Sequence, residues 1–516
     1  MNGAQNLIKT LVAADVNVCF TNPGTSEMHF VAALDQVEGM RAVLGLFEGV
    51  CTGAADGYAR MTGRPASTLL HLGPGLGNGL ANLHNAKRAL SPMVNIVGEH
   101  ATYHIQHDAP LTSPIEQIAW SMSHWVRTSM SPDNISRDTA AAITAARTAP
   151  GQIATLILPG DSSWDPTTAP IITPTAAPQA QINQAAVQNA AAILRSGEPT
   201  LLLLSGKAVL DDGLRLVSQI SQATGVPIMS NRPTARLQMG AGRPLLRSLA
   251  YPLPQSLAQL EEFAHIILVS TAEPVAFFAY PGQPSRLEPA GCQIHTLATP
   301  AEDVVGALAA LADELGLAAD APLSKVEGLD RPGLPSGELT PNAIWQSVAA
   351  QLPEEAIIVN EAITSGAGAG TWLRNLRPFD MLTGTGGSIG HGLPQAVGAA
   401  VACPDRQVVG MQADGSAMYT IQALWTQARE QLNVVTVLFN NRSYEILRGE
   451  MSRVGAMQHG SIADTLFSLD NPQLDFVSIA QGLGVEGSRA TTAEAFNDQF
   501  AAALAKRGPH LIEVLV

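Results

Sequence analysis

The sequence predicts an α/β fold made of three consecutive doubly wound parallel-sheet domains. The chain has 516 residues, and about 150 residues per domain gives three domains of ordinary size. Two stretches rich in proline, threonine, alanine or glycine, Asp165–Asn183 and Ala321–Thr340, divide the chain into three parts. In each part, short β-rich runs alternate with segments of helical periodicity, which is the pattern of a parallel sheet with crossover helices. We therefore expect domains at residues 1–165, 184–320 and 341–516.

The first part opens with helical periodicity over Asn6–Ala14 and continues with apolar, strand-like runs. A second helix is expected from Thr25, and a glycine loop followed by a helical segment separates the last two runs. The expected strands are Val16–Phe20, Arg41–Gly45, Thr68–Leu72 and Val94–Val97.

The second and third parts repeat this alternation. The second part offers four strands: Thr200–Leu204, Val226–Met229, Ile266–Ser270 and Gln293–Leu297. The third part offers four more: Ala356–Val359, Gln407–Met411, Val434–Phe439 and Leu511–Leu515. Long helical segments are expected in the third part at His391–Ala402 and Ile421–Gln431.

Composition favours a small molecule as the partner. Lysine and arginine number 29 against 44 aspartates and glutamates, so the formal charge is −15. This charge opposes binding to nucleic acid or to anionic lipid. No apolar run reaches the roughly 18 residues that a membrane-spanning helix needs, and the first residues lack the pattern of a signal peptide. We therefore expect a cytoplasmic protein that contacts neither nucleic acid nor membrane.

The strongest local signal lies at the ends of two consecutive strands of the third part. Asp414 follows one strand, and Asn441 follows the next strand 27 residues later. Their side chains would meet at the carboxyl edge of the sheet, where open α/β sheets bind ligands. Carboxylate and amide oxygens, with the Ser443 backbone carbonyl, suit Mg²⁺, which takes its other ligands from water and a diphosphate. The N–H groups of Gly415 and Ser416 would bind that diphosphate. For this motif alone, an ordinary strand–helix corner capped by Asp414 is the alternative.

The segment Val408–Asn441, with ADGS at its corner and Asn-Asn at its end, resembles the cofactor motif of thiamine-diphosphate enzymes. That motif is written Gly-Asp-Gly, followed by some two dozen residues and Asn-Asn. Ala413 stands where the family has its first glycine, which affects only the tightness of the turn, because Asp414 and Gly415 are kept. The segments TNPGTSE (Thr21–Glu27) and LLHLGPG (Leu69–Gly75) look like benzoylformate decarboxylases and their acetolactate-synthase-like relatives.

This resemblance covers nearly the whole chain. It implies a pyrimidine-binding domain, a middle Rossmann-like domain and a diphosphate- and Mg²⁺-binding domain, in that order. The implied cofactors are thiamine diphosphate and Mg²⁺, with Asp414, Asn441 and Ser443 as the metal ligands. The residues implied to contact the cofactor are Thr364, Gly387, Ile389, Gly415, Ser416, Asn441, Ser443 and Tyr444.

Glu48 and Ile389 gain specific roles from the resemblance. Glu48 begins a helix rich in small residues within GLFEGVCTGAADGYAR (Gly45–Arg60), which is similar to the activating-glutamate segment of the family. There the carboxylate hydrogen-bonds the aminopyrimidine ring and shifts it to the imino tautomer. Ile389, within GTGGSIGHGLPQAVGAA (Gly384–Ala400), takes the position of the apolar wedge that holds the two cofactor rings in a V shape. The residues alone leave two alternatives open, an acid favoured by the helix dipole and a core isoleucine.

Substrate-side candidates also follow from the resemblance. His71 follows a strand and precedes GPG, and it matches a proton-transfer histidine of benzoylformate decarboxylase. A buried core histidine is the alternative. Thr25 falls where that group has a serine that contacts substrate, so a hydroxyl is kept while a methyl narrows the pocket.

The second proton-transfer histidine of that group has no counterpart in EPVAFFAYPGQ (Glu273–Gln283), where Phe277, Phe278 and Ala279 stand instead. His391 is a candidate replacement donor. The other candidates are His100, His104 and His107, whose spacing also raises the alternative of a zinc site.

The implied reaction is the non-oxidative decarboxylation of a 2-oxo acid. Acetolactate-synthase-type carboligation of 2-oxo acids is the main alternative, and a non-catalytic homologue that binds the cofactor is the remote one. The family also implies a homotetramer, a dimer of dimers, in which Glu48 of one subunit faces the diphosphate site of its neighbour. FAD is an alternative occupant of the middle domain, but we favour an empty one. The glycines of GPGLGNG (Gly73–Gly79) are in the wrong register for a dinucleotide fingerprint.

Overall fold

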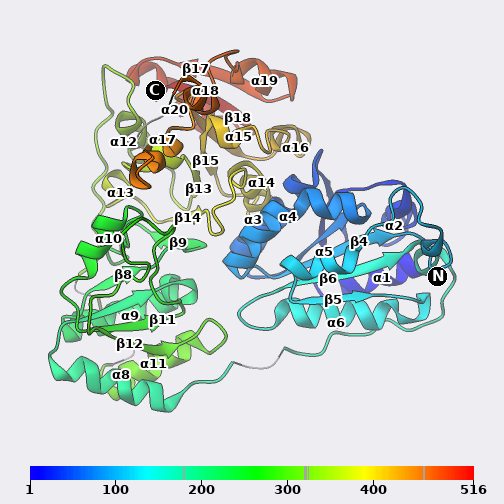
Figure 1. Ribbon diagram of the computed structural model, residues 1–516, viewed down its shortest axis with the longest axis horizontal. Coiled ribbons are helices and arrows are strands. Elements are labelled where there is room, and N and C mark those ends of the chain that lie inside the picture. Colours follow the sequence, from blue (N-terminus) through cyan, green and yellow to red (C-terminus); the bar gives the residue numbers. More distant parts are fainter. Residues whose placement is uncertain (178–179, 319–321, 324, 457–459) are drawn as a thin grey trace.

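The computed structural model describes residues 1–177, 180–318, 322–323, 325–456 and 460–516. Figure 1 shows three α/β units in chain order, each built on its own sheet, so the predicted fold class is confirmed. The described residues of the two expected linkers, Asp165–Asn183 and Ala321–Thr340, form no helix and no strand longer than a single bridge. Residues 178, 179, 321 and 324 of these linkers lie outside the described part. Within the described ranges, no helix is long and apolar enough to cross a membrane.

The first unit is a six-stranded parallel sheet in the order β2-β1-β3-β4-β6-β5. Its strands are β1 (Val18–Asn22), β2 (Arg41–Leu44), β3 (Ala66–Leu70), β4 (Met93–Glu99), β5 (Trp125–Thr128) and β6 (Ile153–Pro159). Its helices are α1 (Gly3–Ala13), α2 (Met28–Leu34), α3 (Glu48–Thr62), α4 (Leu72–Ala89), α5 (Ile115–Met122), α6 (Ile135–Arg147) and α7 (Gly160–Trp164). Strands β5 and β6 extend the sheet beyond the four strands that the sequence predicts.

The glycine segment Gly73–Gly79, expected as a loop, instead forms the first turns of helix α4. Glycine is a poor helix former, and at some of these positions neighbouring side chains leave little room for a larger residue. A Cβ atom on Gly73 would overlap the Ser113 hydroxyl, and one on Gly75 would lie 3.2 Å from Oε1 of Glu48. Tertiary packing therefore determines this helix against local propensity.

The middle unit is a five-stranded parallel sheet in the order β10-β8-β7-β11-β12. Its strands are β7 (Thr200–Leu204), β8 (Ile228–Ser230), β10 (Arg247–Ser248), β11 (His265–Val269) and β12 (Gln293–Ala298). Its helices are α8 (Gln184–Ser196), α9 (Asp211–Thr224), α10 (Leu253–Leu260) and α11 (Val304–Glu314). One further strand from this part of the sequence, β9 (Arg236–Met239), leaves the unit and pairs antiparallel with β14 of the third sheet.

The third unit has a seven-stranded sheet in the order β17-β18-β16-β15-β13-β14-β9, parallel except for β9. Its own strands are β13 (Ile357–Glu361), β14 (Phe379–Thr383), β15 (Val408–Ala413), β16 (Val434–Asn440), β17 (Glu486–Ala490) and β18 (His510–Leu515). Its helices are α12 (Pro341–Gln351), α13 (Ala369–Trp372), α14 (Gly392–Ala402), α15 (Asp414–Ala417), α16 (Ala423–Arg429), α17 (Glu445–Arg453), α18 (Ser461–Phe467), α19 (Phe476–Gly482) and α20 (Ala493–Ala505).

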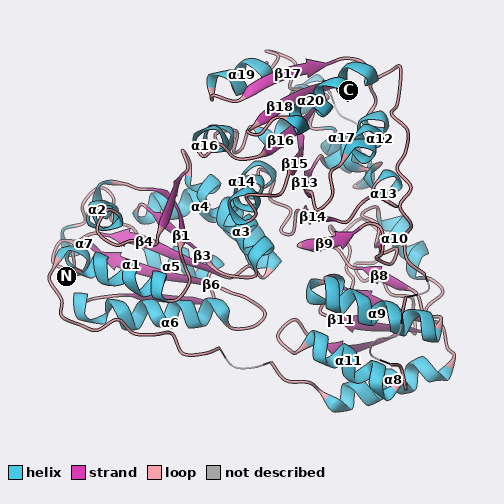
Figure 2. Ribbon diagram, turned by 180° about the vertical axis from the view of Figure 1, so that it is seen from behind, coloured by secondary structure: helices cyan, strands magenta, loops and turns pink. Residues whose placement is uncertain are grey.

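Helices α3 and α14 join the first and third units, and Figure 2 shows them side by side between the two sheets. Small residues allow their backbones to approach closely. A Cβ atom on Gly398 would overlap the carbonyl oxygen of Ala54, and one on Gly57 would overlap the carbonyl oxygen of Gln395. The helix rich in small residues that begins at Glu48 therefore packs closely against a second helix.

A buried ion pair lies in the same interface. Arg60 binds both carboxylate oxygens of Asp56, at 2.7 and 2.9 Å, and each side chain is only 1% exposed. Asp56 also accepts hydrogen bonds from Ser91 of the first unit and Gln395 of the third, at 2.5 and 2.9 Å. Arg60 donates at 3.0 Å to the hydroxyl of Thr385. These bonds fix α3, which begins at Glu48, against the third unit.

Candidate functional site

The residues predicted to bind metal come together at the carboxyl edge of the third sheet. Asp414 begins α15 directly after β15, and its Oδ2 accepts the N–H of Arg442, 2.7 Å away. Its Oδ1 accepts the N–H of Gly415 at 2.7 Å. Burial raises the pKa of the Asp414 carboxyl, and the surrounding backbone N–H groups oppose this rise. The spacing argument therefore placed Asp414 and the segment after β16 correctly.

The donor set at this edge fits a hard divalent cation. It combines the Asp414 carboxylate, the Asn441 side chain and the backbone around Ser443, whose N–H donates to Oδ1 of Asn441 at 3.0 Å. Mg²⁺ prefers oxygen ligands of this kind and completes its shell with water and phosphate oxygens. The ring of Tyr444 covers Gly415 so closely that a Cβ atom there would overlap it. Only glycine fits between the aspartate and this ring.

Ile389 lies half-buried in the loop that precedes α14. Two asparagines of α4 hold this loop from the first unit. Asn82 donates to the carbonyl oxygen of Gly390 at 3.2 Å, and Asn85 donates to that of Ser388 at 2.9 Å. The loop therefore packs against the first unit of its own chain, whereas the family resemblance pairs Glu48 with the diphosphate site of a neighbouring subunit.

Glu48 lies where the first unit meets the third, as the first residue of α3, and it is 9% exposed. Its Oε2 accepts a hydrogen bond from the side chain of Asn78, 3.0 Å away. Asn82, one turn further along α4, donates to the carbonyl oxygen of Gly49 at 2.8 Å as well as to that of Gly390. One asparagine thus links the start of the Glu48 helix to the Ile389 loop.

The polar stripe of α4 is a part of the site that the sequence analysis missed. Asn78, Asn82 and Asn85 are spaced as i, i+4 and i+7, which places them on one face of a helix. This spacing was the available signal. The spacing indicates a shared helix face only when the glycine segment Gly73–Gly79 is known to be helical.

His71 is oriented by a buried carboxylate that the sequence analysis did not identify. It is the residue directly before α4, and its Nδ1 lies 2.9 Å from Oε2 of Glu27, which is 2% exposed. Ser26 donates to Oε1 of the same carboxylate at 2.6 Å. Because Nδ1 faces a carboxylate, it carries the hydrogen and leaves Nε2 as the free ring nitrogen. Thr25, predicted to contact substrate, is exposed at the start of the same short helical turn, Thr25–Glu27.

His391 has protein partners for both ring nitrogens. Its Nδ1 lies 3.1 Å from Oε1 of Gln395, and its Nε2 lies 3.5 Å from Oε1 of Glu361. The residue is 5% exposed. This environment favours a role in holding the loop over the proton transfer to substrate that the sequence suggested.

The remaining histidine candidates lie together in the segment after β4. The ring centroids of His100 and His104 are 5.4 Å apart, and those of His104 and His107 are 5.7 Å apart. Nevertheless, no group of three or more His, Cys, Asp or Glu side chains in the described residues could hold a metal ion. The described residues therefore give the alternative of a zinc site no support.

Phe277, from the middle unit, lies against Gly387 in the loop that carries Ile389. A Cβ atom on Gly387 would lie 2.7 Å from Cζ of its ring. Phe277 and Phe278 are 54% and 51% exposed, and their ring centroids are 4.8 Å apart. The segment in which the family has its second histidine therefore brings exposed aromatic rings to the site. Thr364 lies in the short turn Ile363–Gly366 after β13, at the same carboxyl edge as Asp414.

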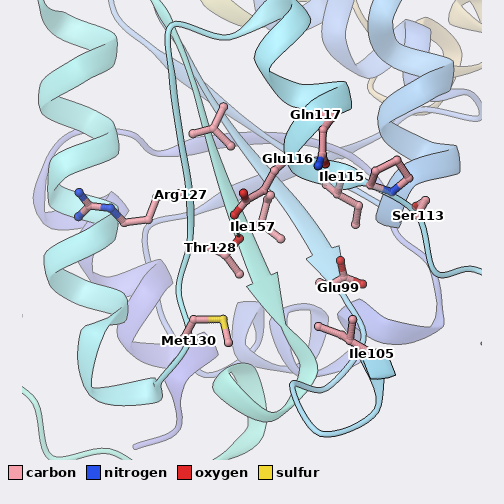
Figure 3. Close-up of a pocket in the computed structure, with 12 residues that line it drawn as sticks. Glu99, Ile105, Ser113, Ile115, Glu116, Gln117, Arg127, Thr128, Met130 and Ile157 are labelled. Atoms are coloured by element: carbon pink, nitrogen blue, oxygen red, sulfur yellow. Dashed lines mark hydrogen bonds between the residues drawn. The ribbon is translucent and has the colours of Figure 1, made fainter. Parts of the chain in front are cut away.

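A cavity of about 550 Å³ lies at the carboxyl ends of β4, β5 and β6. Figure 3 shows the Glu99 carboxylate and Ile105 at one end of it, while Arg127 points away toward α6. Ser113, also in its lining, packs against Gly73, two residues after His71. Burial raises the pKa of Glu99, although the N–H of the next residue donates to its Oε1. The cavity therefore borders the His71 turn.

Comparisons with known proteins agree with this geometry. Residues 1–120 match the model of the N-terminal TPP binding domain of thiamine pyrophosphate enzymes, and residues 366–514 match that of the C-terminal TPP binding domain. Thiamine pyrophosphate is the same compound as thiamine diphosphate. The two matched segments contain the Glu48 and His71 region and the Asp414 to Tyr444 region, so fold and site define a thiamine-diphosphate-dependent enzyme.

Individual relatives show which family of thiamine-diphosphate-dependent enzymes the chain belongs to. It is 52% identical to Mycobacterium tuberculosis IlvX, which carries the name of an acetolactate synthase large subunit, over 100% of this chain and 99% of the relative. It is 30% identical to a benzoylformate decarboxylase of Pseudomonas aeruginosa, over 96% and 95% of the two chains. The structure of a Rhodococcus jostii thiamine diphosphate-dependent 4-hydroxybenzoylformate decarboxylase aligns with a TM-score of 0.87 at 26% identity, covering 100% and 99%. The chain belongs to the acetolactate synthase and benzoylformate decarboxylase family of thiamine-diphosphate-dependent enzymes.

Proposed function

We propose that this enzyme decarboxylates a 2-oxo acid without oxidation, with Mg²⁺ holding the diphosphate of its cofactor. The observation that carries the proposal is the Glu27–His71 pair, which sets a histidine with a free Nε2 at the edge of the sheet that also carries Glu48. Bound thiamine diphosphate supplies a nucleophilic carbon and an electron sink for the pair left when CO₂ departs. The protein then has to position the substrate and move protons.

Each group of the site has a part in this scheme. Asp414, Asn441 and Ser443 would hold the metal, and Glu48 would hydrogen-bond the aminopyrimidine ring of the bound cofactor. His71 would take a proton from water on Nε2 and pass it to the carbon from which CO₂ has left, so that a hydrogen replaces the carboxylate. Glu27 keeps the His71 ring in the tautomer that leaves Nε2 available.

Carboligation is the second candidate, and a specific observation favours it. The exposed rings of Phe277 and Phe278 stand where a second proton-transfer histidine is found in benzoylformate decarboxylases. Where that proton donor is missing, the carbon that has lost CO₂ can form a bond to the carbonyl carbon of a second 2-oxo acid instead of taking up a proton. The name of the relative that is 52% identical points the same way.

We further propose that the enzyme works as a dimer of dimers. Exposed apolar side chains flank the site residues: Leu46 is 43% exposed two residues before Glu48, and Tyr419 is 54% exposed five residues after Asp414. Exposed apolar groups beside a site are expected where a second subunit covers them. Light scattering of the purified chain gives its mass in solution, and a monomer would refute this assembly.

The test of the proposed activity compares the native enzyme with Glu48→Gln. Both should bind thiamine diphosphate in a Mg²⁺-dependent way, but only the native enzyme should release CO₂ from a panel of aliphatic and aromatic 2-oxo acids. Normal turnover by the variant would remove Glu48 from the mechanism. The product from pyruvate alone separates the two reactions, since decarboxylation gives acetaldehyde and carboligation gives acetolactate.

A further inference from the structure

Glu361, the last residue of β13, places a buried carboxylate against the start of α14. Its Oε1 accepts the backbone N–H groups of Gly390 at 2.7 Å and His391 at 3.2 Å. Its Oε2 accepts the N–H of Gly392 at 2.7 Å. The side chain is 0% exposed, and burial of a carboxylate is costly unless hydrogen bonds compensate it. These three consecutive N–H groups provide that compensation.

The same carboxylate is tied to the metal-binding corner. Gln412, on the neighbouring strand β15, donates from its Nε2 to Oε2 of Glu361 at 2.9 Å and lies 2.7 Å from the hydroxyl of Ser416. Ser416 is two residues after Asp414. One amide group therefore links the Glu361 carboxylate to the turn that carries the predicted metal ligand.

His391 completes the arrangement from the other side. Gln395 points its Nε2 at Asp56, 2.9 Å away, so its Oε1 is the acceptor for Nδ1 of His391 at 3.1 Å. The imidazole ring is thus fixed between Gln395 and Glu361. His391, which directly follows Ile389 and Gly390, is therefore held through both its backbone N–H and its imidazole ring.

The loop needs such support because its backbone is intrinsically permissive. Gly387 has φ +77° and Gly390 has φ +93°, in the region that glycine adopts more readily than other residues. Ile389 lies between these two glycines. Without external contacts, flanking glycines would let the isoleucine side chain occupy many positions.

We propose that Glu361 is a positioning residue, which sets the place of the Ile389 side chain by clamping the backbone of Gly390–Gly392. The proposal rests on the proposed function, in which Ile389 holds the cofactor rings in their bent conformation. Glu361 itself contacts neither cofactor nor substrate in this scheme. A carboxylate is required because both of its oxygens face N–H donors.

Glu361→Gln is the informative change. It keeps the size of the side chain but turns one acceptor oxygen into an NH₂ donor that faces an N–H group. Asp138→Asn is the matched control, because Asp138 is also a buried carboxylate, 2% exposed, that binds Arg127 and Ser129 on the far side of the first sheet. Both variants lose one charge and one buried acceptor.

The first measurement is amide hydrogen exchange of the full chain without cofactor, read on peptides that cover residues 384–395. Exchange there should rise at least tenfold in Glu361→Gln and stay unchanged in Asp138→Asn. If Glu361→Gln does not fold, Gln412→Leu removes the fourth hydrogen bond of the carboxylate, together with the Gln412–Ser416 contact, keeps the three backbone bonds, and should increase exchange in the same peptides by a smaller factor. Unchanged exchange in the folded variant would overturn the clamp.

The second measurement is the induced near-ultraviolet circular dichroism of bound thiamine diphosphate, which reports how its two rings are held. Glu361→Gln and Ile389→Ala should alter it in the same way, and combining them should add little to the loss of turnover caused by Ile389→Ala alone. Independent, multiplicative losses would overturn the proposal. A native chain that fails to bind the cofactor would overturn the proposed function as well, whereas native binding with an unaltered variant spectrum would overturn only the clamp.

Discussion

Asp56→Ala tests how far the buried ion pair of α3 holds the first and third units together. The change leaves the guanidinium of Arg60, 1% exposed, without its counter-charge. It also removes the acceptor of Ser91 and of Gln395. Breaking a buried pair by removing one partner costs about 3–5 kcal/mol, and each orphaned buried donor adds about 1–3 kcal/mol unless water reaches it. We therefore expect a loss of at least about 3 kcal/mol.

The assay is urea denaturation followed by tryptophan fluorescence, with Glu486→Ala as the control. Glu486 pairs with Lys506 on the surface, where the two side chains are 55% and 66% exposed, and exposed pairs contribute about 0–1 kcal/mol. The two variants should therefore differ clearly in the free energy of unfolding. If Asp56→Ala lost less than 1 kcal/mol, like the control, the account of the α3–α14 interface would be refuted.

Four further substitutions probe the site and the cavity beside it. His71→Ala should lower kcat about a hundredfold or more, as loss of a proton-transfer group does, and Glu27→Gln, which only weakens the support of the His71 ring, should lower it less; steady-state kinetics checks both, and an unchanged kcat in His71→Ala would remove His71 from the mechanism. Gly415→Ala forces a Cβ atom into the ring of Tyr444 and should weaken cofactor binding, measured by calorimetry, together with about 1–3 kcal/mol of stability. Burial raises the pKa of Glu99 in the folded chain, so its ionised form destabilises the fold above that pKa. Glu99→Gln should therefore raise the melting temperature at pH 7, and the gain should vanish as the pH falls to about 3, below the unfolded-state pKa of about 4.3, where the carboxyl is protonated in both states; an equal gain at pH 7 and pH 3 would contradict this reasoning.

Buried strands were predictable because their composition is sufficient to define them. Strand β7 has the bounds that its leucine run predicts, Thr200–Leu204. Strand β17 (Glu486–Ala490) is different, since it is mostly polar and lies at the edge of its sheet. Its extended conformation depends on pairing with β18, which no local pattern reveals. The crossing of β9 into the third sheet likewise depends on contacts distant in sequence.

The same distinction between local pattern and distant contacts applies to the candidate site. Asp414 and the segment after Asn441 could be brought together from sequence because parallel strands end at one edge of a sheet. Two other contacts could not be predicted from sequence, that of Asn82 with Gly390 and that of Glu361 with Gly392. They join different elements across the fold, and the first pair is 308 residues apart in the chain. Such partners become visible only when the units are assembled.

The most direct test of the central claim is the binding of thiamine diphosphate to metal-stripped protein, with and without Mg²⁺, followed by CO₂ release in the same sample. Asp414→Ala is the comparison, because it removes the carboxylate of the predicted metal site. The account predicts Mg²⁺-dependent binding by the native chain, CO₂ release from at least one 2-oxo acid, and loss of both in the variant. Absence of cofactor binding by the native chain, or equal binding by Asp414→Ala, would contradict it.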